Sequence, residues 1–266
     1  MELTTYNFLL LCVFGASLLT FVILMFISAP YGKQERDGWG PGVNMRFGWF
    51  ILELPAFAGM LYFYWKGSQT LLTAPLVLFA LFQIHYFHRT FIYPFTLRIK
   101  PDARYKIILL SFGMTFNAVN GALNGWFLST LATHLHSSDW LLDPRFIAGL
   151  LLFCAGFALA KQSDAILRNL RKPGETGYKI PHGGAYRWVS CPNYFGEILQ
   201  WTGFALAGWS LPALAFVCFT AANLVPKALS SHRWYREKFS DYPAERKAIF
   251  PFCYEKSMSV IHAEFF

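Results

Sequence analysis

Charge is scarce in this sequence of 266 residues: 14% are Asp, Glu, Lys or Arg, whereas an average soluble domain carries about 25%. The five cysteines are dispersed without a CxxC pair, which argues against a disulfide framework or a cysteine metal site. No GxGxxG or GxxxxGK[ST] string occurs, so neither a Rossmann nor a P-loop phosphate site is expected. Together these absences argue against a soluble nucleotide-binding or metal-binding domain.

Hydrophobic residues, by contrast, make up 55% of the chain and 19% of it is aromatic. A helix needs about 20 mostly apolar residues to cross a bilayer. Such runs occupy residues 7–29, 47–65, 71–93, 107–133, about 140–160, and 193 to beyond 226. The last run is interrupted near Pro212, and its length allows one long helix or two shorter ones. The sequence therefore predicts an all-α, polytopic integral membrane protein.

Positive charges decide between these two readings, because segments that face the cytoplasm collect Lys and Arg. All but three of the 23 Lys and Arg residues lie between spans 1 and 2, between spans 3 and 4, after span 5, or after the last run; the exceptions are Lys66, Arg89 and Arg145. If the last run crosses twice, all of these segments share one side. We therefore expect one domain over residues 1–266 with seven transmembrane helices, the N-terminus outside and the C-terminus cytoplasmic. Orientation then explains the net charge of +8, and nucleic acid is not an expected partner.

A few polar residues interrupt the apolar runs, where an ionisable group costs about 2.5–3.5 kcal/mol to insert. Glu53 lies in the middle of WFILELPAF, and Tyr86 and Arg89 share one face of the third run. Asn117, Asn120 and Asn124 share a face of the fourth run and would form interhelical hydrogen bonds in the simplest interpretation. Arg89 either has a buried function or extends to the interface. A protonated or hydrogen-bonded Glu53 beside a tyrosine hydroxyl suits the stabilisation of an enolate oxygen.

Two segments are expected on the cytoplasmic side, residues 161–193 and 232–254. Both contain many charged residues and are interrupted by Gly or Pro. Asp164, Arg168 and Arg171 fall at i, i+4 and i+7 on one helix face, and Asn193 and Glu197 follow at i and i+4. A solvated, salt-bridged helix is the simplest interpretation of the first set. A nucleotide, if present, would be held by arginines and loops at this membrane face.

Five strings taken together resemble the steroid 5α-reductase (3-oxo-5α-steroid 4-dehydrogenase) family: WFILELPAF, HYFHRTFIYP, LRKPGETGYKIPHGGAYRWVSCPNYFGE, WSLPALAF and HRWYREKFSDYPAERKAIFPF. They fall within a core of about residues 45–254. The resemblance implies a seven-helix membrane enzyme that uses NADPH to reduce the C4–C5 double bond of a 3-oxo-Δ4-steroid to the 5α product. The steroid would arrive from the lipid phase, and no obligate protein partner is evident. The compartment would be the endoplasmic reticulum in a eukaryote and the inner membrane in a bacterium.

The resemblance also assigns roles to individual residues. Glu53 and Tyr86 match the positions that hold the steroid 3-oxo oxygen. The positions that match or are expected to face the cofactor are Lys33, Arg98, Asp164, Arg168, Arg171, Tyr178, Asn193, Glu197 and Tyr235.

Three positions depart from the family pattern: Leu52 replaces a Gln, Ala160 an Asn, and Ser231 a member of a His cluster. They affect the expected substrate and affinity more than the reaction class. One alternative is therefore a reductase of the same family that acts on another conjugated enone or an enoyl thioester. More distant alternatives are an isoprenylcysteine-type membrane methyltransferase, suggested by CPNYFGE, and a transporter or sterol-binding scaffold.

Overall fold

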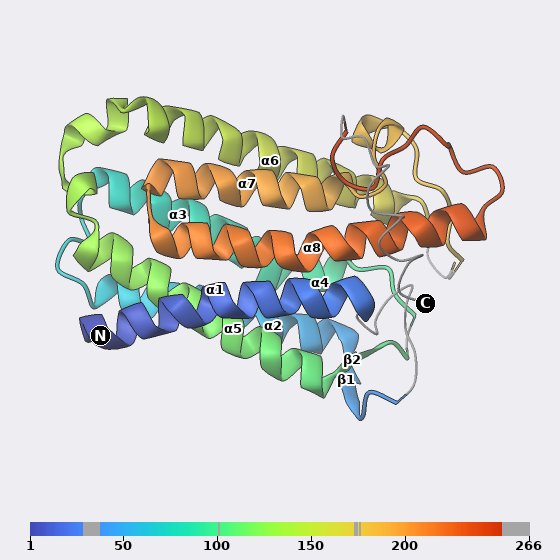
Figure 1. Cartoon of the computed structure of the whole chain (residues 1–266), viewed down its shortest axis with the longest axis horizontal. Helices are drawn as coiled ribbons and strands as arrows, with labels where there is room; N and C mark the ends of the chain where they lie inside the picture. Colours follow the sequence, from blue (N-terminus) through green and yellow to red (C-terminus); the bar gives the residue numbers. More distant parts are fainter. Residues whose placement is uncertain (29–37, 101, 173–174, 176, 252–266) are drawn as a thin grey trace.

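Long helices that run side by side make up most of the protein (Figure 1). The structure is a computed structural model, and it describes residues 1–28, 38–100, 102–172, 175 and 177–251. In chain order the elements are α1 (Leu3–Phe26), β1 (Gly42–Asn44), α2 (Met45–Trp65), α3 (Thr73–Phe87), the π-helix η2 (His88–Ile92), α4 (Tyr93–Thr96), β2 (Arg104–Lys106), α5 (Ile107–Trp126), the π-helix η3 (Phe127–Leu131), the 3-10 helices η4 (Thr133–His136) and η5 (Ser138–Leu142), α6 (Pro144–Asn169), the 3-10 helix η6 (Gly184–Arg187), α7 (Pro192–Gly208) and α8 (Leu211–Lys238).

Local signals fix where several of these helices begin. The Asn44 side chain accepts hydrogen bonds from the backbone N–H groups of Arg46 and Phe47, at 3.0 and 3.3 Å, and so caps α2. Pro144 and Pro192 occupy the first position of α6 and α7, where the missing N–H of proline costs no helical hydrogen bond. These caps start the three helices that carry Glu53, Asp164, Arg168, Asn193 and Glu197.

The last apolar run forms two helices, which confirms one of the two interpretations of its length. Helix α7 ends at Gly208, and Trp209 adopts the left-handed conformation with φ of 43°. The Ser210 side chain then accepts a hydrogen bond from the backbone N–H of Ala213 and caps α8. The chain thus reverses direction within two residues (Figure 1).

Glycines allow two helix pairs to pack backbone against backbone. A Cβ atom on Gly203 of α7 would lie 2.4 Å from the backbone nitrogen of Phe153 in α6. A Cβ atom on Gly121 of α5 would lie 2.6 Å from the carbonyl oxygen of Ala56 in α2. The pairs α6–α7 and α2–α5 therefore have closely fixed spacing, and both pairs carry site residues.

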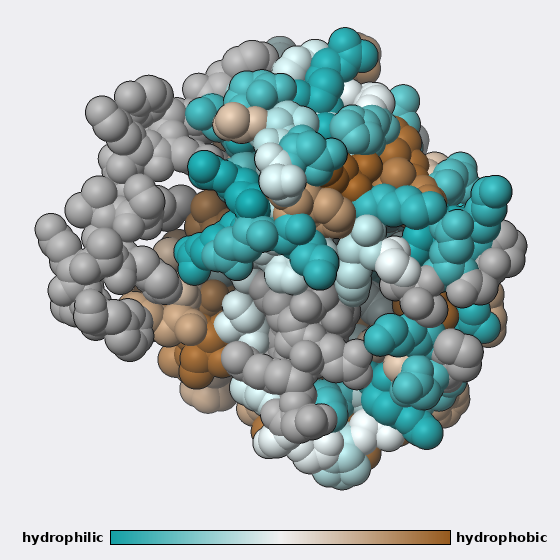
Figure 2. All heavy atoms as spheres, turned by 90° about the vertical axis from the view of Figure 1, so that its right-hand side faces the viewer, coloured by the Kyte–Doolittle hydropathy of each residue, from teal (hydrophilic) through white to brown (hydrophobic). Residues whose placement is uncertain are grey.

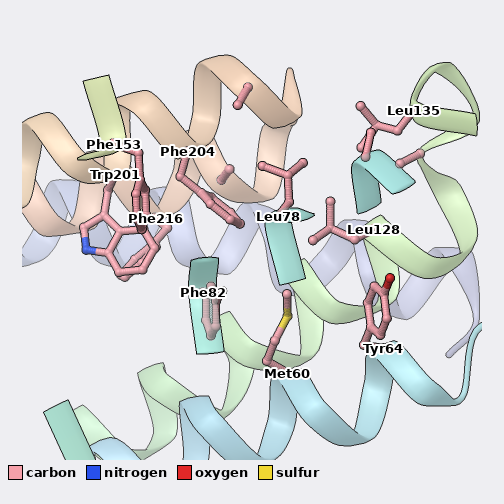
Figure 3. Packing of buried hydrophobic residues seen from close by; sticks show 14 of the residues in the cluster. Met60, Tyr64, Leu78, Phe82, Leu128, Leu135, Phe153, Trp201, Phe204 and Phe216 are labelled. Carbon is pink, nitrogen blue, oxygen red and sulfur yellow. The ribbon is translucent and has the colours of Figure 1, made fainter. Parts of the chain in front are cut away.

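Apolar side chains form the interior and also cover much of the outside. Figure 3 shows Phe82, Trp201, Phe204 and Phe216 packed together from α3, α7 and α8. Much of the outer surface of α1 is also apolar, with Leu11 70% exposed. Exposed apolar surface of this extent is typical of a membrane or partner interface.

Five helical segments in the described residues are long and apolar enough to cross a membrane: α1, α2, α5 with η3, α6 and α8. The structure thus bears out a largely α-helical protein with several membrane-capable helices. Helix α3 has 15 residues, but it continues directly through η2 into α4, and α7 has 17 residues. Seven spans and the orientation of the termini stay predictions.

One end of the bundle, opposite the N-terminus, gathers the polar loops (Figure 1). We call it the polar end: the antiparallel β1–β2 pair, residues 177–191 before α7, and residues 239–251 after α8. The last two segments are joined by a bridge between Val189 and Lys247. Hydrophilic residues gather on this face in Figure 2, in contrast to the apolar flanks.

Candidate active site

Glu53 lies inside the bundle on α2, where its residue is only 6% exposed. Its Oε1 accepts a hydrogen bond from Arg89 Nε at 3.0 Å, and its Oε2 accepts one from Asn117 Nδ2 at 3.3 Å. Asn117 also donates to the Leu52 carbonyl oxygen at 2.7 Å. The carboxylate that the sequence singled out is therefore buried, paired and held by α5 and η2.

Arg89 is the partner that sequence reasoning left undecided. It lies in the π-helix η2, and its side chain is 17% exposed, so it points into the protein. Its NH1 is 3.9 Å from Glu197 Oε2, and its guanidinium carbon is 4.9 and 5.0 Å from the ring centres of Trp49 and Tyr93. Buried charges normally require such partners. Arg89 thereby links Glu53, which is predicted to bind the substrate, to Glu197, which is predicted to face the cofactor.

Tyr86 is 3% exposed on α3 and has a hydroxyl group with a free proton. Asn120 Nδ2 donates to Tyr86 Oη at 3.3 Å, and Asn124 Nδ2 donates to Asn120 Oδ1 at 2.9 Å, which fixes the orientation of the Asn120 amide. Tyr86 Oη is thus the acceptor in this contact, and no described residue accepts its proton. A tyrosine in this arrangement can donate to a ligand carbonyl.

Helix α5 joins Glu53 and Tyr86, which make no direct hydrogen bond to each other. Asn117 contacts Glu53, and Asn120, three residues later on the same face, contacts Tyr86. The shared face of these asparagines, predicted from their spacing, is confirmed. Asn117 and Asn120 form interhelical hydrogen bonds, to the two residues predicted to be catalytic, whereas Asn124 bonds to Asn120 within α5.

A pocket of about 170 Å³ at the polar end brings together four of the nine residues predicted to face a cofactor. Arg171, Tyr178, Asn193 and Tyr235 all line it. The Arg171 guanidinium carbon lies 5.7 Å from the ring centre of Tyr178. Lys179 also lines this pocket, and its 2.6 Å ion pair lowers the pKa of the Glu175 carboxyl. The pocket combines cationic and aromatic groups, as a nucleotide site requires.

The other five predicted cofactor residues lie around this pocket or outside the described residues. Asp164 accepts a hydrogen bond from Asn193 at 3.1 Å, and Arg98 donates to the Arg171 carbonyl oxygen. Glu197, one turn after Asn193 on α7, faces Arg89 as described. Arg168 lies one turn after Asp164 on α6, and within the described chain no hydrogen bond or ion pair joins it to the rest of the set. Lys33 lies outside the described residues.

Sequence reasoning missed a hydrogen-bond network beside the pocket. Ser190, which lines the pocket, contacts His232 Nδ1 and Tyr242 Oη, both at 2.6 Å, and also the Lys247 carbonyl oxygen at 3.2 Å. These partners lie 42 to 57 positions away, so no spacing pattern could have revealed them. The network holds residues 239–251 against α8 and the loop before α7.

Arg246 in that segment was also missed. It is 3% exposed, and its Nε and NH1 have no hydrogen-bond partner in the described structure. Among the described residues, the guanidinium has one polar contact, between NH2 and His182 Nδ1 at 3.4 Å, and it lies over the Tyr242 ring. A buried guanidinium with free donors is suited to an anion.

Comparison with known proteins agrees with the resemblance drawn from the sequence. Residues 103–254 match the family model described as 3-oxo-5-alpha-steroid 4-dehydrogenase. The chain is 39% identical to steroid 5-alpha-reductase DET2 of Gossypium hirsutum over 256 residues, which cover 94% of this chain and 98% of that protein. It is 43% identical to 3-oxo-5-alpha-steroid 4-dehydrogenase 1 of Rattus norvegicus over 232 residues, which cover 86% and 88% of the two chains. It is 44% identical to 3-oxo-5-alpha-steroid 4-dehydrogenase 2 of Sus scrofa over 241 residues, which cover 87% and 91%.

Proposed function

Because the chain belongs to the 3-oxo-5α-steroid 4-dehydrogenase, or steroid 5α-reductase, family, we propose that it reduces the C4–C5 double bond of 3-oxo-Δ4-steroids to 5α-dihydrosteroids with NADPH. Family membership makes the protein an oxidoreductase that acts on a CH–CH group. The choice of NADPH and the roles of individual residues are the proposal.

The observation that carries the mechanism is the free hydroxyl proton of Tyr86, buried near the Glu53–Arg89 pair. Tyr86 donates a hydrogen bond to the 3-oxo oxygen, and Glu53, in its protonated form, donates a second one from α2. Both contacts draw electron density toward the oxygen, so that C5 becomes electrophilic. Donors placed where negative charge develops are worth about 100- to 1,000-fold in rate each. A proton at C4 then completes the reduction.

The polar end fits a phosphate-bearing cofactor. Arg171 and Lys179 line its pocket, and Arg246 offers two buried donor nitrogens, Nε and NH1, that have no partner among the described residues. Asn193, Asp164 and Glu197 continue from this pocket toward Arg89 along α6 and α7. When bound, NADPH supplies the hydride that attacks C5. The protein contributes the alignment of substrate with cofactor and the exclusion of water.

We also propose the topology and location that this arrangement requires. The chain is a single membrane domain with seven spans, the N-terminus outside, and the polar end on the cytoplasmic side where NADPH is available. The steroid enters from the lipid, and no protein partner is needed. The membrane is the endoplasmic reticulum in a eukaryotic host and the inner membrane in a bacterial one.

Leu52 supports a second candidate, a reductase of the same family that acts on another conjugated enone or an enoyl thioester. Its side chain packs with Met45, Tyr105 and Leu110 and offers no hydrogen bond to a substrate. Substrate choice therefore depends on Glu53 and Tyr86 without help from this position.

A substrate panel separates the two candidates. Purified protein in lipid or detergent is given NADPH with testosterone, progesterone or a long enoyl-CoA, and oxidation of NADPH and product are measured. The proposal expects 5α-dihydrosteroid from the steroids and little turnover of the thioester. Turnover of the thioester alone would support the second candidate, and steroid binding without any oxidation would indicate a binding protein.

A further inference from the structure

Arg89 has no role in the proposed function, yet it connects the two halves of the site. Its Nε donates to Glu53 Oε1 at 3.0 Å on α2, and its NH1 lies 3.9 Å from Glu197 Oε2 on α7. The first carboxylate belongs to the expected ketone site and the second to the expected cofactor site. The Arg89 guanidinium thus lies near two carboxylates. It donates a hydrogen bond to Glu53 and makes only a longer ionic contact with Glu197.

The surroundings of Arg89 allow it to serve either carboxylate. Trp49 and Tyr93 lie against its guanidinium at 4.9 and 5.0 Å, and such stacking fixes the guanidinium without selecting a partner. The distance to Glu197 exceeds a normal hydrogen bond of 2.7–3.2 Å by roughly 1 Å. A small side-chain movement can therefore exchange one partner for the other.

The chemistry of a ketone makes this exchange important. A ketone oxygen accepts hydrogen bonds, and an ionised carboxylate also only accepts them, whereas a protonated carboxyl group donates. Arg89 favours the ionised form of Glu53, because an opposite charge at hydrogen-bond distance favours ionisation. While it is ionised, Glu53 cannot donate to a 3-oxo oxygen.

We propose that Arg89 is a positioning residue that controls whether Glu53 can donate a hydrogen bond to the substrate carbonyl. While Arg89 pairs with Glu53, the carboxylate is an acceptor. When Arg89 turns to Glu197, Glu53 takes up one proton from water and becomes a donor. This inference rests on the proposed function and adds a role for Glu197 to its expected place beside the cofactor.

The charged and titratable groups around Glu53 come from each neighbouring element. They are Tyr86 of α3, Arg89 of η2, Tyr93 of α4, Lys161 of α6 and Glu197 of α7, and Asn117 of α5 adds a neutral hydrogen bond. Arg89 is the cation in direct contact with Glu53. Its removal should make protonation of Glu53 easier, and removal of the negative Glu197 should make it harder.

The test is the pH profile of kcat/KM for the steroid, measured with saturating NADPH. If a protonated Glu53 is required, wild-type activity declines as the pH rises. Arg89→Gln should move this decline upward by about 1 to 3 pH units, while Glu197→Gln moves it downward. Glu53→Gln cannot ionise, so its residual activity should lack the decline altogether. Arg89→Lys keeps the charge and should leave the decline near its wild-type position.

Arg145 provides a matched control. It also pairs with a carboxylate, Asp143, at 2.7 Å, and lies over two rings, those of Trp140 and Trp209, at 4.5 and 4.9 Å. It begins α6, at the opposite end of that helix from Asp164. Arg145 is more exposed than Arg89, at 40% against 17% of the side chain, so Arg145→Gln should cost less stability. It should leave the pH profile unmoved.

The possible outcomes are distinct. If the wild-type protein turns over steroid and Arg89→Gln lowers the rate equally at every pH, Arg89 is only structural and the inference is overturned. If Arg89→Gln does not fold, a downward shift in Glu197→Gln supports the inference, and an unmoved profile overturns it. If the wild-type protein shows no steroid-dependent NADPH oxidation at any pH, the proposed function fails and the inference fails with it.

Discussion

Replacement of Tyr86 by Phe tests the proposed carbonyl contact with little disturbance of the fold. The substitution removes one oxygen atom from a residue that is 3% exposed and leaves the ring packed against Phe82 and Trp201. Within the protein it also removes the acceptor for Asn120 Nδ2. An unsatisfied buried donor of this kind costs about 1–3 kcal/mol of folding free energy.

The expected catalytic effect is larger than this structural one. Loss of one donor to a developing oxyanion typically lowers kcat by about 100- to 1,000-fold. Stability alone does not reduce the rate of the molecules that stay folded, so the two effects separate when kcat is normalised to folded protein. The affinity for NADPH should stay nearly unchanged, because Tyr86 does not line the pocket at the polar end.

Tyr64 is the matched control. It is 0% exposed on α2, and its hydroxyl group donates to the Thr70 carbonyl oxygen at 2.8 Å. Tyr64→Phe therefore loses a buried tyrosine hydrogen bond of comparable energy at a place without a proposed function. Steroid-dependent turnover and thermal unfolding are measured for both variants. Turnover of Tyr86→Phe within threefold of wild type, or equal impairment of both variants, would refute the reasoning.

Two further substitutions test the cofactor pocket and the helix packing. Asn193→Ala removes a pocket-lining amide that also binds Asp164. It should raise the KM for NADPH by about tenfold or more with little change in kcat. The exposed Thr202 donates its hydroxyl to the Ile198 carbonyl oxygen within α7, so Thr202→Ala should change neither the KM for NADPH nor kcat. Equal effects of the two substitutions would contradict the pocket assignment. Gly203→Ala places a Cβ 2.4 Å from α6 backbone and should cost about 1–3 kcal/mol, seen as a lower unfolding temperature. A Cβ atom on Gly15 would meet no atom of the described residues within 4 Å, so Gly15→Ala should not destabilise the protein. An unfolding temperature of Gly203→Ala equal to that of Gly15→Ala would contradict the close packing of α6 and α7.

Much of the fold was predictable because membrane insertion imposes simple rules on the sequence. Apolar runs of sufficient length located the helices, and the positions of Lys and Arg correctly favoured two helices in the last run. The π-helix at residues 88–92 was not predictable, because no residue type marks it. It matters because a π-turn changes which face Arg89 presents after Tyr86.

Individual site residues were predictable where a charged or polar residue interrupts an apolar run of the sequence. Glu53 was found because it is the lone charge in an apolar run, and the asparagines of α5 because their spacing shares one face. The hydrogen-bond partners of these residues were not predictable. Glu53 and Arg89 are 36 positions apart in the sequence, and their contact depends on how the two helices are rotated. The same limit hid Ser190 and Arg246, whose contacts arise where residues 239–251 fold back on the bundle.

The most direct test of the account follows the hydrogen that reaches C5. Purified protein is incubated with a 3-oxo-Δ4-steroid and NADPH that carries deuterium at C4 of the nicotinamide, and the product is examined by mass spectrometry and NMR. The account predicts a single deuterium at C5 on the α face and a solvent-derived hydrogen at C4. Deuterium at C4, a 5β product, or no steroid-dependent oxidation of NADPH would contradict it.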